Sequence, residues 1–204
     1  MKKLPLIIII AVLSLGGVWF GTNLANNPGE KKDVKVLQAQ TQREATTAPS
    51  ESETVSSAIP VNIRIPKIGV DGSIEEVGLD SKRAMDVPQD ADNAGWYKYG
   101  AHPGTKGNAV LAGHLDKQSG APAIFFKLTE LKNGDSIFIT DASGDEYEYK
   151  ITRQEKYPYD DFPIGEVFGQ TDKSMLNLIT CQGNWDDSAK NYSHRTVIYS
   201  EMVQ

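Results

Sequence analysis

The stretch Asn177-Leu-Ile-Thr-Cys-Gln-Gly-Asn-Trp185 holds the only cysteine of the 204-residue chain. An apolar run precedes the cysteine and a polar, glycine-bearing segment follows it, so Cys181 is expected at the end of a buried strand. A lone cysteine cannot form an intrachain disulfide, which leaves packing, reactivity or an intermolecular bond as its roles. Taken alone, it is most often a core residue, because free cysteines are among the most buried residue types.

Short strands are predicted on both sides of this stretch, with turn signals between them. The segments with strand character are residues 61–65, 73–77, 108–113, 136–140, 146–152, 175–180 and 195–202. Residues 123–131 instead carry apolar side chains at helical spacing. Seven or more short strands with only one or two short helices predict a mainly β fold, either a sandwich or a closed barrel.

The N-terminus has the pattern of a membrane anchor. Residues 4–20 carry no charge and follow Lys2 and Lys3. About twenty such residues span a bilayer core, and the positive-inside rule then places the N-terminus in the cytoplasm. We therefore expect residues 1–24 to comprise cytoplasmic lysines and a transmembrane helix. The alternative is a cleaved signal peptide, but no small-x-small cleavage site follows the apolar run.

The remaining chain divides into a linker and one domain. Residues 25–58 are polar and almost without aromatic side chains, so they cannot bury enough apolar surface to offset their chain entropy. We expect a disordered tether there and one globular domain over residues 59–204. The net charge of −6 argues against nucleic acid as a partner, since a phosphate backbone requires a basic face.

Three side chains with useful chemistry are predicted at strand ends: His114, Cys181 and Arg195. A thiolate attacks acyl carbons, and an imidazole can protonate a leaving amine. A guanidinium offers fixed donors to an oxyanion. Each residue alone has a more ordinary explanation, namely a core thiol, a loop histidine and a surface ion pair. Together, on an outward-facing domain, they favour acyl transfer.

Two further histidines are weighed against His114. His194 adjoins Arg195 and is the alternative base. Successive residues of a strand point to opposite faces, so His194 is expected on the face opposite to Arg195, which favours His114. His102 lies in a glycine-rich segment and is interpreted as structural.

The motifs Leu111-Ala-Gly-His-Leu-Asp116 and Leu178-Ile-Thr-Cys181, with Arg195 fourteen positions after the cysteine, resemble the signature of the sortases. These are membrane-anchored cysteine transpeptidases of Gram-positive bacteria. The resemblance covers residues 63–202 and includes Arg64-Ile-Pro-Lys-Ile-Gly69 and Gly95-Trp96. The details around Cys181 and Asp116 are most similar to the class F or class E groups.

The resemblance implies a closed eight-stranded β-barrel and a cysteine transpeptidase and endopeptidase of the hydrolase class. Cys181 would attack the Thr–Gly bond of a sorting signal of the Leu-Pro-x-Thr-Gly (LPXTG) type. An amine of a peptidoglycan precursor would then resolve the thioacyl enzyme and attach the protein to the cell wall. His114 would act as general acid and then base, and Arg195 as oxyanion or substrate clamp. The catalytic domain would face outward from the plasma membrane.

Recognition of the sorting signal is placed by the resemblance in the loop of residues 157–173. The expected substrate-binding residues are Thr180, Ile164, Val167, Phe168 and Trp185. The apolar members of this set have another explanation, which is that they pack a short helical turn onto the barrel.

No metal or cofactor is expected. Some sortases bind calcium through acidic loops, and Asp160, Asp161 and Glu166 are candidates here, but they lack the ligand spacing of a calcium loop. Two other functions stay open. An L,D-transpeptidase-like cell-wall enzyme usually has a Ser-x-Gly-Cys-x-Arg pattern, which residues 179–183 do not contain. A non-catalytic, membrane-tethered β module predicts a buried and inert Cys181.

Overall fold

The computed structural model describes residues 58–203 of the chain. In chain order its elements are β1 (Pro60–Ile65), the 3₁₀ turn η1 (Pro66–Ile68), β2 (Val70–Val77), β3 (Ala94–Tyr97), β4 (Gly107–Ala112), the 3₁₀ turn η2 (Leu128–Glu130), β5 (Ser136–Asp141), β6 (Glu146–Pro158), α1 (Ile164–Phe168), β7 (Ser174–Asp186) and β8 (Asn191–Met202). Within residues 58–203 no helix is long and apolar enough to cross a membrane. The anchor expected in residues 1–24 and the linker up to residue 57 lie outside the described residues.

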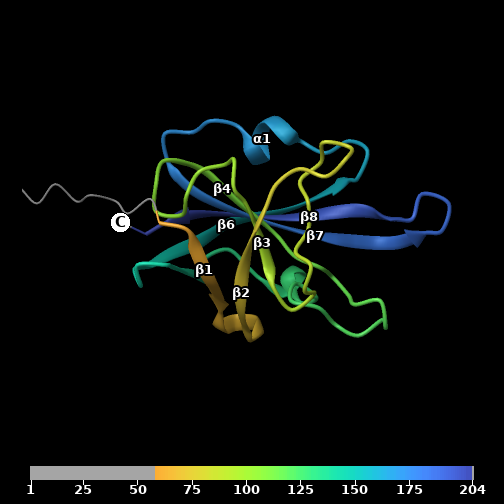
Figure 1. The fold of residues 1–204 in the computed structure, drawn as a ribbon, viewed down its shortest axis with the longest axis horizontal. Helices are drawn as coiled ribbons and strands as arrows, with labels where there is room; N and C mark the ends of the chain where they lie inside the picture. The colour runs from red at the N-terminus through yellow and green to blue at the C-terminus, as the bar shows by residue number, and fades with distance from the viewer. Residues whose placement is uncertain (1–57, 204) are drawn as a thin grey trace, which may run out of the picture. The chain divides into compact units, whose positions relative to one another are not determined.

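The eight strands form a closed barrel in the order β1-β2-β3-β4-β7-β8-β6-β5 (Figure 1). Strands β1 and β5 pair to close the sheet. Most neighbouring strands are antiparallel, whereas β2 pairs with β3 and β4 pairs with β7 in parallel. This arrangement confirms the expected mainly β fold, a closed barrel of eight strands with few helical segments.

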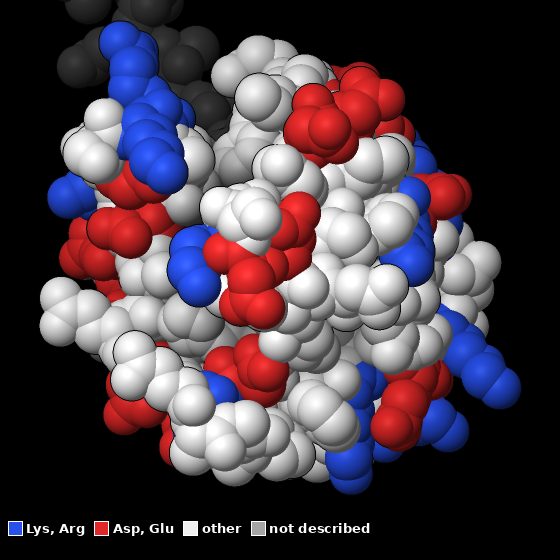
Figure 2. All heavy atoms as spheres, turned by 90° about the vertical axis from the view of Figure 1, so that its right-hand side faces the viewer, with Lys and Arg blue, Asp and Glu red and all other residues white. Residues whose placement is uncertain are grey.

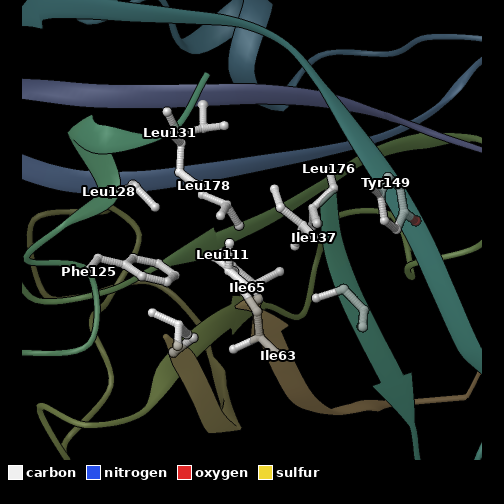
Figure 3. Packing of buried hydrophobic residues seen from close by; sticks show 14 of the residues in the cluster. Ile63, Ile65, Leu111, Phe125, Leu128, Leu131, Ile137, Tyr149, Leu176 and Leu178 are labelled. Atoms are coloured by element: carbon white, nitrogen blue, oxygen red, sulfur yellow. The ribbon is translucent and has the colours of Figure 1, made fainter. Parts of the chain in front are cut away.

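The barrel interior is filled by apolar side chains (Figure 3). In β5 every second residue is buried, so Ile137 and Ile139 point inward while their neighbours face outward. Ile63, Leu111 and Leu178 meet them from three other strands, each with no exposed surface. Burial of a side chain of this size contributes roughly 1.5–3 kcal/mol, so the barrel is a packed core that holds its strands in fixed register.

A second apolar cluster lies on the outer face of the barrel, beneath α1. Val110 of β4 and Val197 and Tyr199 of β8 pack there against Val167 of α1. All six residues of β4 are buried, because its inner face meets the core and its outer face meets this cluster. The helix α1 therefore covers the outer face of β4 and the strands beside it.

The helix predicted over residues 123–131 is wrong. Only Leu128–Glu130 forms a helical turn there, of the 3₁₀ type. The apolar spacing nevertheless marks the buried side correctly, since Phe125, Leu128 and Leu131 all enter the core. A 3₁₀ turn aligns residues i and i+3, so a short irregular segment produces the same pattern as a helix.

The strands near the expected site are longer than the sequence predicts. Strand β7 continues five residues beyond Cys181, and β8 begins at Asn191, four residues before Arg195. The two form a hairpin that extends past the rest of the sheet at the right of Figure 1. Figure 2 looks onto that side, where acidic and basic side chains are interspersed between broad uncharged areas.

Candidate active site

Cys181 lies directly opposite Arg195 in the β7–β8 pairing. Residues paired in this way point to the same face of a sheet, so the two side chains are neighbours. Ile179 and Val197, one rung earlier on that face, belong to the outer cluster beneath α1. The thiol and the guanidinium are therefore outside the barrel, on the face that α1 covers further along.

His114 is held beside Cys181 by hydrogen bonds between the two chain segments. The backbone N–H of Gly113 donates to the Ile179 carbonyl at 3.0 Å, and Thr180 Oγ1 donates to the Gly113 carbonyl at 2.8 Å. A side chain at Gly113 would place its Cβ 2.3 Å from the buried ring of Phe125, so only glycine fits before the histidine. His114 and Cys181 line one pocket of about 600 Å³.

The His114 ring is oriented by a backbone carbonyl from a distant loop. Its Nε2 lies 3.0 Å from the Pro88 oxygen. A carbonyl oxygen only accepts hydrogen bonds, so Nε2 carries the proton in this contact. In the neutral ring Nδ1 is then the nitrogen with the lone pair.

Glu75 of β2 fixes the loop that carries Pro88. Its carboxylate accepts hydrogen bonds from the backbone N–H of Gln89 at 2.9 Å and of Asp90 at 3.2 Å. It also accepts one from Asn93 Nδ2 at 2.9 Å. Glu75 therefore positions His114 indirectly, through the Pro88 carbonyl.

These contacts predict a pH-dependent contribution of Glu75 to stability. The hydrogen bonds from Asn93 and Gln89 hold the pKa of Glu75 below its ordinary value of 4.5. A carboxyl whose pKa is lowered by folding contributes stability above its unfolded pKa and loses that contribution as the pH falls through the folded pKa. We expect wild type to melt at a higher temperature than Glu75→Gln at pH 6. The difference should shrink below about pH 4.5 in thermal melts, and a pH-independent difference would contradict this assignment.

Arg195 is fixed by acceptors around its guanidinium. Nη2 donates to Asn191 Oδ1 at 2.7 Å, and Nη1 donates to the carbonyls of His194 at 3.0 Å and Tyr192 at 3.3 Å. Within residues 58–203 Arg195 makes no ion pair, unlike an ordinary surface arginine. The charge is thus rigidly placed beside Cys181 without a neutralising carboxylate.

Burial and two neighbouring charges shift the pKa of Cys181 in opposite directions. Burial raises the pKa of Cys181 above its ordinary value of 9.0, the Arg195 charge lowers it, and Asp116 raises it again. Burial dominates, so the thiol is mostly protonated at neutral pH. Its conversion to the thiolate therefore requires a proton acceptor, and His114 lines the same pocket.

The rest of the pocket lining comes mostly from the β7–β8 hairpin and from the residues after His114. Tyr192 donates its hydroxyl hydrogen to Asp116 Oδ2 at 2.6 Å, and this bond is the largest cause that raises the pKa of Tyr192 to about 12. The Trp185 ring packs edge-on against the Tyr192 ring, with centroids 5.2 Å apart. Trp185 itself is half exposed and lines the pocket.

The other expected substrate-binding residues do not line this pocket. Thr180 is 2% exposed and donates to the Gly113 carbonyl. On α1, Ile164 is exposed, Val167 is buried against the barrel and Phe168 packs against Tyr97. The structure thus places these three apolar residues along the outer face that also carries Cys181, but not in the lining of the pocket.

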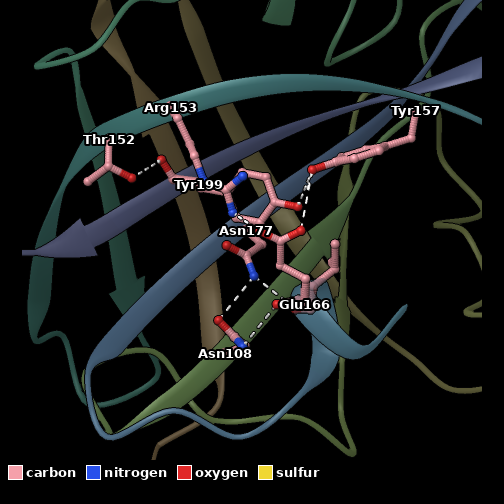
Figure 4. Close-up of polar contacts among 8 residues, drawn as sticks. Asn108, Thr152, Arg153, Tyr157, Glu166, Asn177 and Tyr199 are labelled. Atoms are coloured by element: carbon pink, nitrogen blue, oxygen red, sulfur yellow. Dashed lines mark hydrogen bonds and ion pairs between the residues drawn. The ribbon is translucent and has the colours of Figure 1, made fainter. Parts of the chain in front are cut away.

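A polar network attaches α1 to the barrel (Figure 4). Asn177 Nδ2 donates to the Val167 carbonyl at 2.8 Å, and Asn108 Nδ2 donates to the Gly169 carbonyl at 2.8 Å. Glu166 of α1 pairs with Arg153, whose guanidinium carbon lies 3.6 Å from the centroid of the Tyr199 ring. Glu166, weighed above as a calcium ligand, is thereby engaged by a cation. In the described part of the chain no three His, Cys, Asp or Glu side chains are grouped as a metal site.

The remaining histidines are occupied elsewhere. His194 pairs with Gln182 on the strand face opposite to Arg195, and its Nδ1 lies 2.8 Å from Ser193 Oγ. His102 packs against the Trp96 ring with centroids 4.7 Å apart. Neither lines the pocket that contains Cys181.

Four residues that organise the site were not predicted from the sequence: Glu75, Pro88, Asn191 and Tyr192. Glu75 and Pro88 act through loop geometry, and no sequence pattern marks them. Tyr192 and Asn191 had a usable signal, because they precede Arg195 in what proves to be one strand. With those residues in place, the structure brings together a thiol, an imidazole and a guanidinium, which are groups that can supply a nucleophile, a proton carrier and oxyanion donors.

Comparison with known proteins identifies the family of this domain. The sortase domain model matches residues 63–203. Among solved structures, sortase C-1 from Actinomyces oris is 23% identical with a TM-score of 0.56, and the match covers 74% of each chain. A lid mutant of sortase A from Corynebacterium diphtheriae is 22% identical over 75% of this chain and 74% of that one, with a TM-score of 0.55.

A third similar structure is sortase C1 from Streptococcus agalactiae, which is 23% identical over 71% of this chain and 67% of that one, with a TM-score of 0.55. A search of curated protein sequences found no match. At these identities the structural likeness shows the fold, and the domain match shows the family. This protein belongs to the sortase family, with its sortase domain over residues 63–203.

Proposed function

We propose that this sortase is a membrane-anchored cysteine transpeptidase that cleaves an LPXTG-type sorting signal between Thr and Gly and transfers the cleaved protein to a cell-wall amine. The observation that carries the proposal is the placement of Cys181 directly opposite Arg195 and in one pocket with His114. These three residues come from two distant segments of the chain, so their meeting is a property of the fold.

In the first half of the reaction, His114 takes the proton of the Cys181 thiol, and the sulphur attacks the Thr carbonyl carbon. Arg195, fixed by Asn191 and two backbone carbonyls, directs N–H donors toward the oxyanion that forms. The tetrahedral intermediate collapses as the C–N bond breaks. His114 gives its proton to the leaving Gly amine, which leaves a thioacyl enzyme.

The proposed path of the sorting signal follows the outer face of the barrel toward α1. The outer cluster under α1 lies on the same strand face as Cys181 and begins at Ile179 and Val197. Exposed apolar surface of α1, above all at Ile164, is available to the Leu-Pro part of the signal. Trp185 lines the same pocket as the thiol.

The proposed location follows from the sequence alone. Residues 1–24 would anchor the chain in the plasma membrane with the N-terminus in the cytoplasm, and residues 25–58 would tether the catalytic domain outside. The resemblance to class F or E sortases likewise stays a prediction.

The non-catalytic alternative predicts an inert, buried Cys181. In the structure Cys181 is partly exposed and lines the pocket, which favours the enzyme.

The direct test uses residues 59–204, whose barrel closes and fills its core without the preceding segment. We expect this domain to cleave a fluorogenic LPXTG peptide between Thr and Gly, as read by mass spectrometry. Addition of hydroxylamine should convert the product to a threonine hydroxamate, because it intercepts the thioacyl enzyme. A peptide with the same composition in scrambled order is the control. Cleavage of both peptides at equal rates would refute sorting-signal specificity.

A further inference from the structure

An acidic side chain shares the pocket with the nucleophile. Asp116 lines the pocket together with Cys181 and His114, and its Oδ2 accepts the Tyr192 hydroxyl at 2.6 Å. Because Tyr192 is the donor and its pKa is raised to about 12, the hydroxyl stays protonated and holds the carboxylate in place. The pocket thus carries a fixed negative charge.

This charge opposes the first half of the proposed reaction. Asp116 raises the pKa of Cys181, which lowers the thiolate fraction. Lys117 also lines the pocket but pairs elsewhere, because its Nζ lies 2.6 Å from Asp92 Oδ2. Within residues 58–203 Arg195 makes no ion pair with Asp116 either. A carboxylate that hinders attack on the first substrate needs another explanation.

We propose that Asp116 is the docking group for the ammonium of the acceptor substrate in the second half of the reaction. The acceptor class is a peptide chain that ends in a primary amine. A carboxylate within a pocket concentrates cations near it, and the adjacent rings of Trp185 and Tyr192 offer π-faces to an ammonium. This inference rests on the proposed function.

The walls of the pocket give the two substrates separate approaches. Trp185, Asn191 and Tyr192 line it from the β7–β8 hairpin, whereas no residue of α1 does so. The acceptor would enter from the hairpin side while the thioacyl group remains along the face toward α1.

The second step then balances as follows. The ammonium bound at Asp116 gives its proton to His114, which became neutral when it protonated the first leaving amine. The free amine nitrogen forms a bond with the acyl carbon, and the carbon–sulphur bond breaks. The nitrogen then loses a second proton, which goes to the departing Cys181 thiolate and restores the thiol. His114 releases to solvent the proton that it took from the ammonium, so the enzyme returns to a thiol and a neutral histidine.

The test is Asp116→Asn in the barrel domain, which keeps an oxygen acceptor for Tyr192 and removes the charge. With an LPXTG peptide and triglycine as acceptor, we expect the KM for triglycine to rise roughly five- to tenfold. Thioacyl formation, measured as the burst of released Gly fragment, should become faster at neutral pH because the pKa of Cys181 falls. The matched control is Asp145→Asn, an exposed acid in the β5–β6 turn, which should change neither quantity.

A neutral acceptor separates docking from a general defect. Hydroxylamine is uncharged at neutral pH, so it should resolve the thioacyl enzyme equally well in wild type and Asp116→Asn. Raising the salt concentration should raise the KM for triglycine in wild type and not in the variant. An unchanged KM for triglycine, or an equal loss with hydroxylamine, would overturn the assignment. Failure of wild type to form a thioacyl enzyme would instead overturn the proposed function.

Discussion

Cys181→Ala is expected to reduce cleavage of the LPXTG peptide to the background rate, a loss of at least about 10³-fold. The variant removes the only thiol of the chain, and no other side chain lining the pocket is a comparable nucleophile. Cleavage is followed by fluorescence with residues 59–204 at equal protein concentrations. A Cys181→Ala protein that still cleaved the peptide at the wild-type rate would eliminate the thioacyl mechanism.

Two further measurements serve as controls for this experiment: the thermal stability of Cys181→Ala and the alkylation rate of the wild-type thiol. Because Cys181 is partly buried, the alanine change is small, and the thermal melt should stay close to that of wild type. In wild type, a small alkylating reagent should label the thiol slowly at neutral pH and faster as the pH rises, since burial raises its pKa above 9.0. A thiol that resists the reagent even at high pH would support the non-catalytic module instead.

His114→Ala is expected to lower kcat by about 10²–10⁴-fold, the usual contribution of a general acid and base. The matched variant is His194→Ala. His194 precedes Arg195 in the chain, its ring contacts Ser193, and it does not line the pocket. His194→Ala should retain activity within about threefold, a change of less than 1 kcal/mol. Initial rates with the LPXTG peptide compare the two proteins.

Chemical rescue distinguishes a lost proton carrier from a disturbed fold. His114 lines an open pocket, so added imidazole can enter the space that His114→Ala leaves. We expect imidazole to restore part of the activity of His114→Ala and none of the activity of Cys181→Ala. Loss of activity in His194→Ala with retention in His114→Ala would show that the general acid is His194.

Much of the barrel could be predicted from local patterns. The alternation of apolar and polar residues in β1, β5 and β6 gives their positions, because a strand with one face in a core has a period of two. Strand β3 was missed, since its four residues Ala94–Tyr97 include three that are buried and show no alternation. The helix expected at residues 123–131 does not form for a related reason. The spacing of apolar residues shows which side chains are buried, but it does not determine the backbone conformation.

The site could be predicted in part. His114, Cys181 and Arg195 stood out through motif spacing and a family resemblance. The structure pairs Cys181 with Arg195 and places Cys181 and His114 in one pocket. The role of Glu75 could not be predicted, because it depends on a loop folding back so that Pro88 reaches a histidine 26 positions later. Asp116 was visible as a residue near His114, but its partner Tyr192 is 76 positions away.

The sequence by itself determined the positions of most strands, three candidate catalytic residues and the family to which the motifs point. These properties depend on residues that are close together in the sequence or that form short motifs, so they can be recognised without the structure. Only the tertiary structure decided that Cys181 lies opposite Arg195 on the outer face, that burial outweighs the guanidinium in setting the pKa of the thiol, and that Asp116 shares a pocket with the thiol. Electrostatic and hydrogen-bonding effects act over a few ångströms in space, and the closure of the barrel sets which residues come within that range.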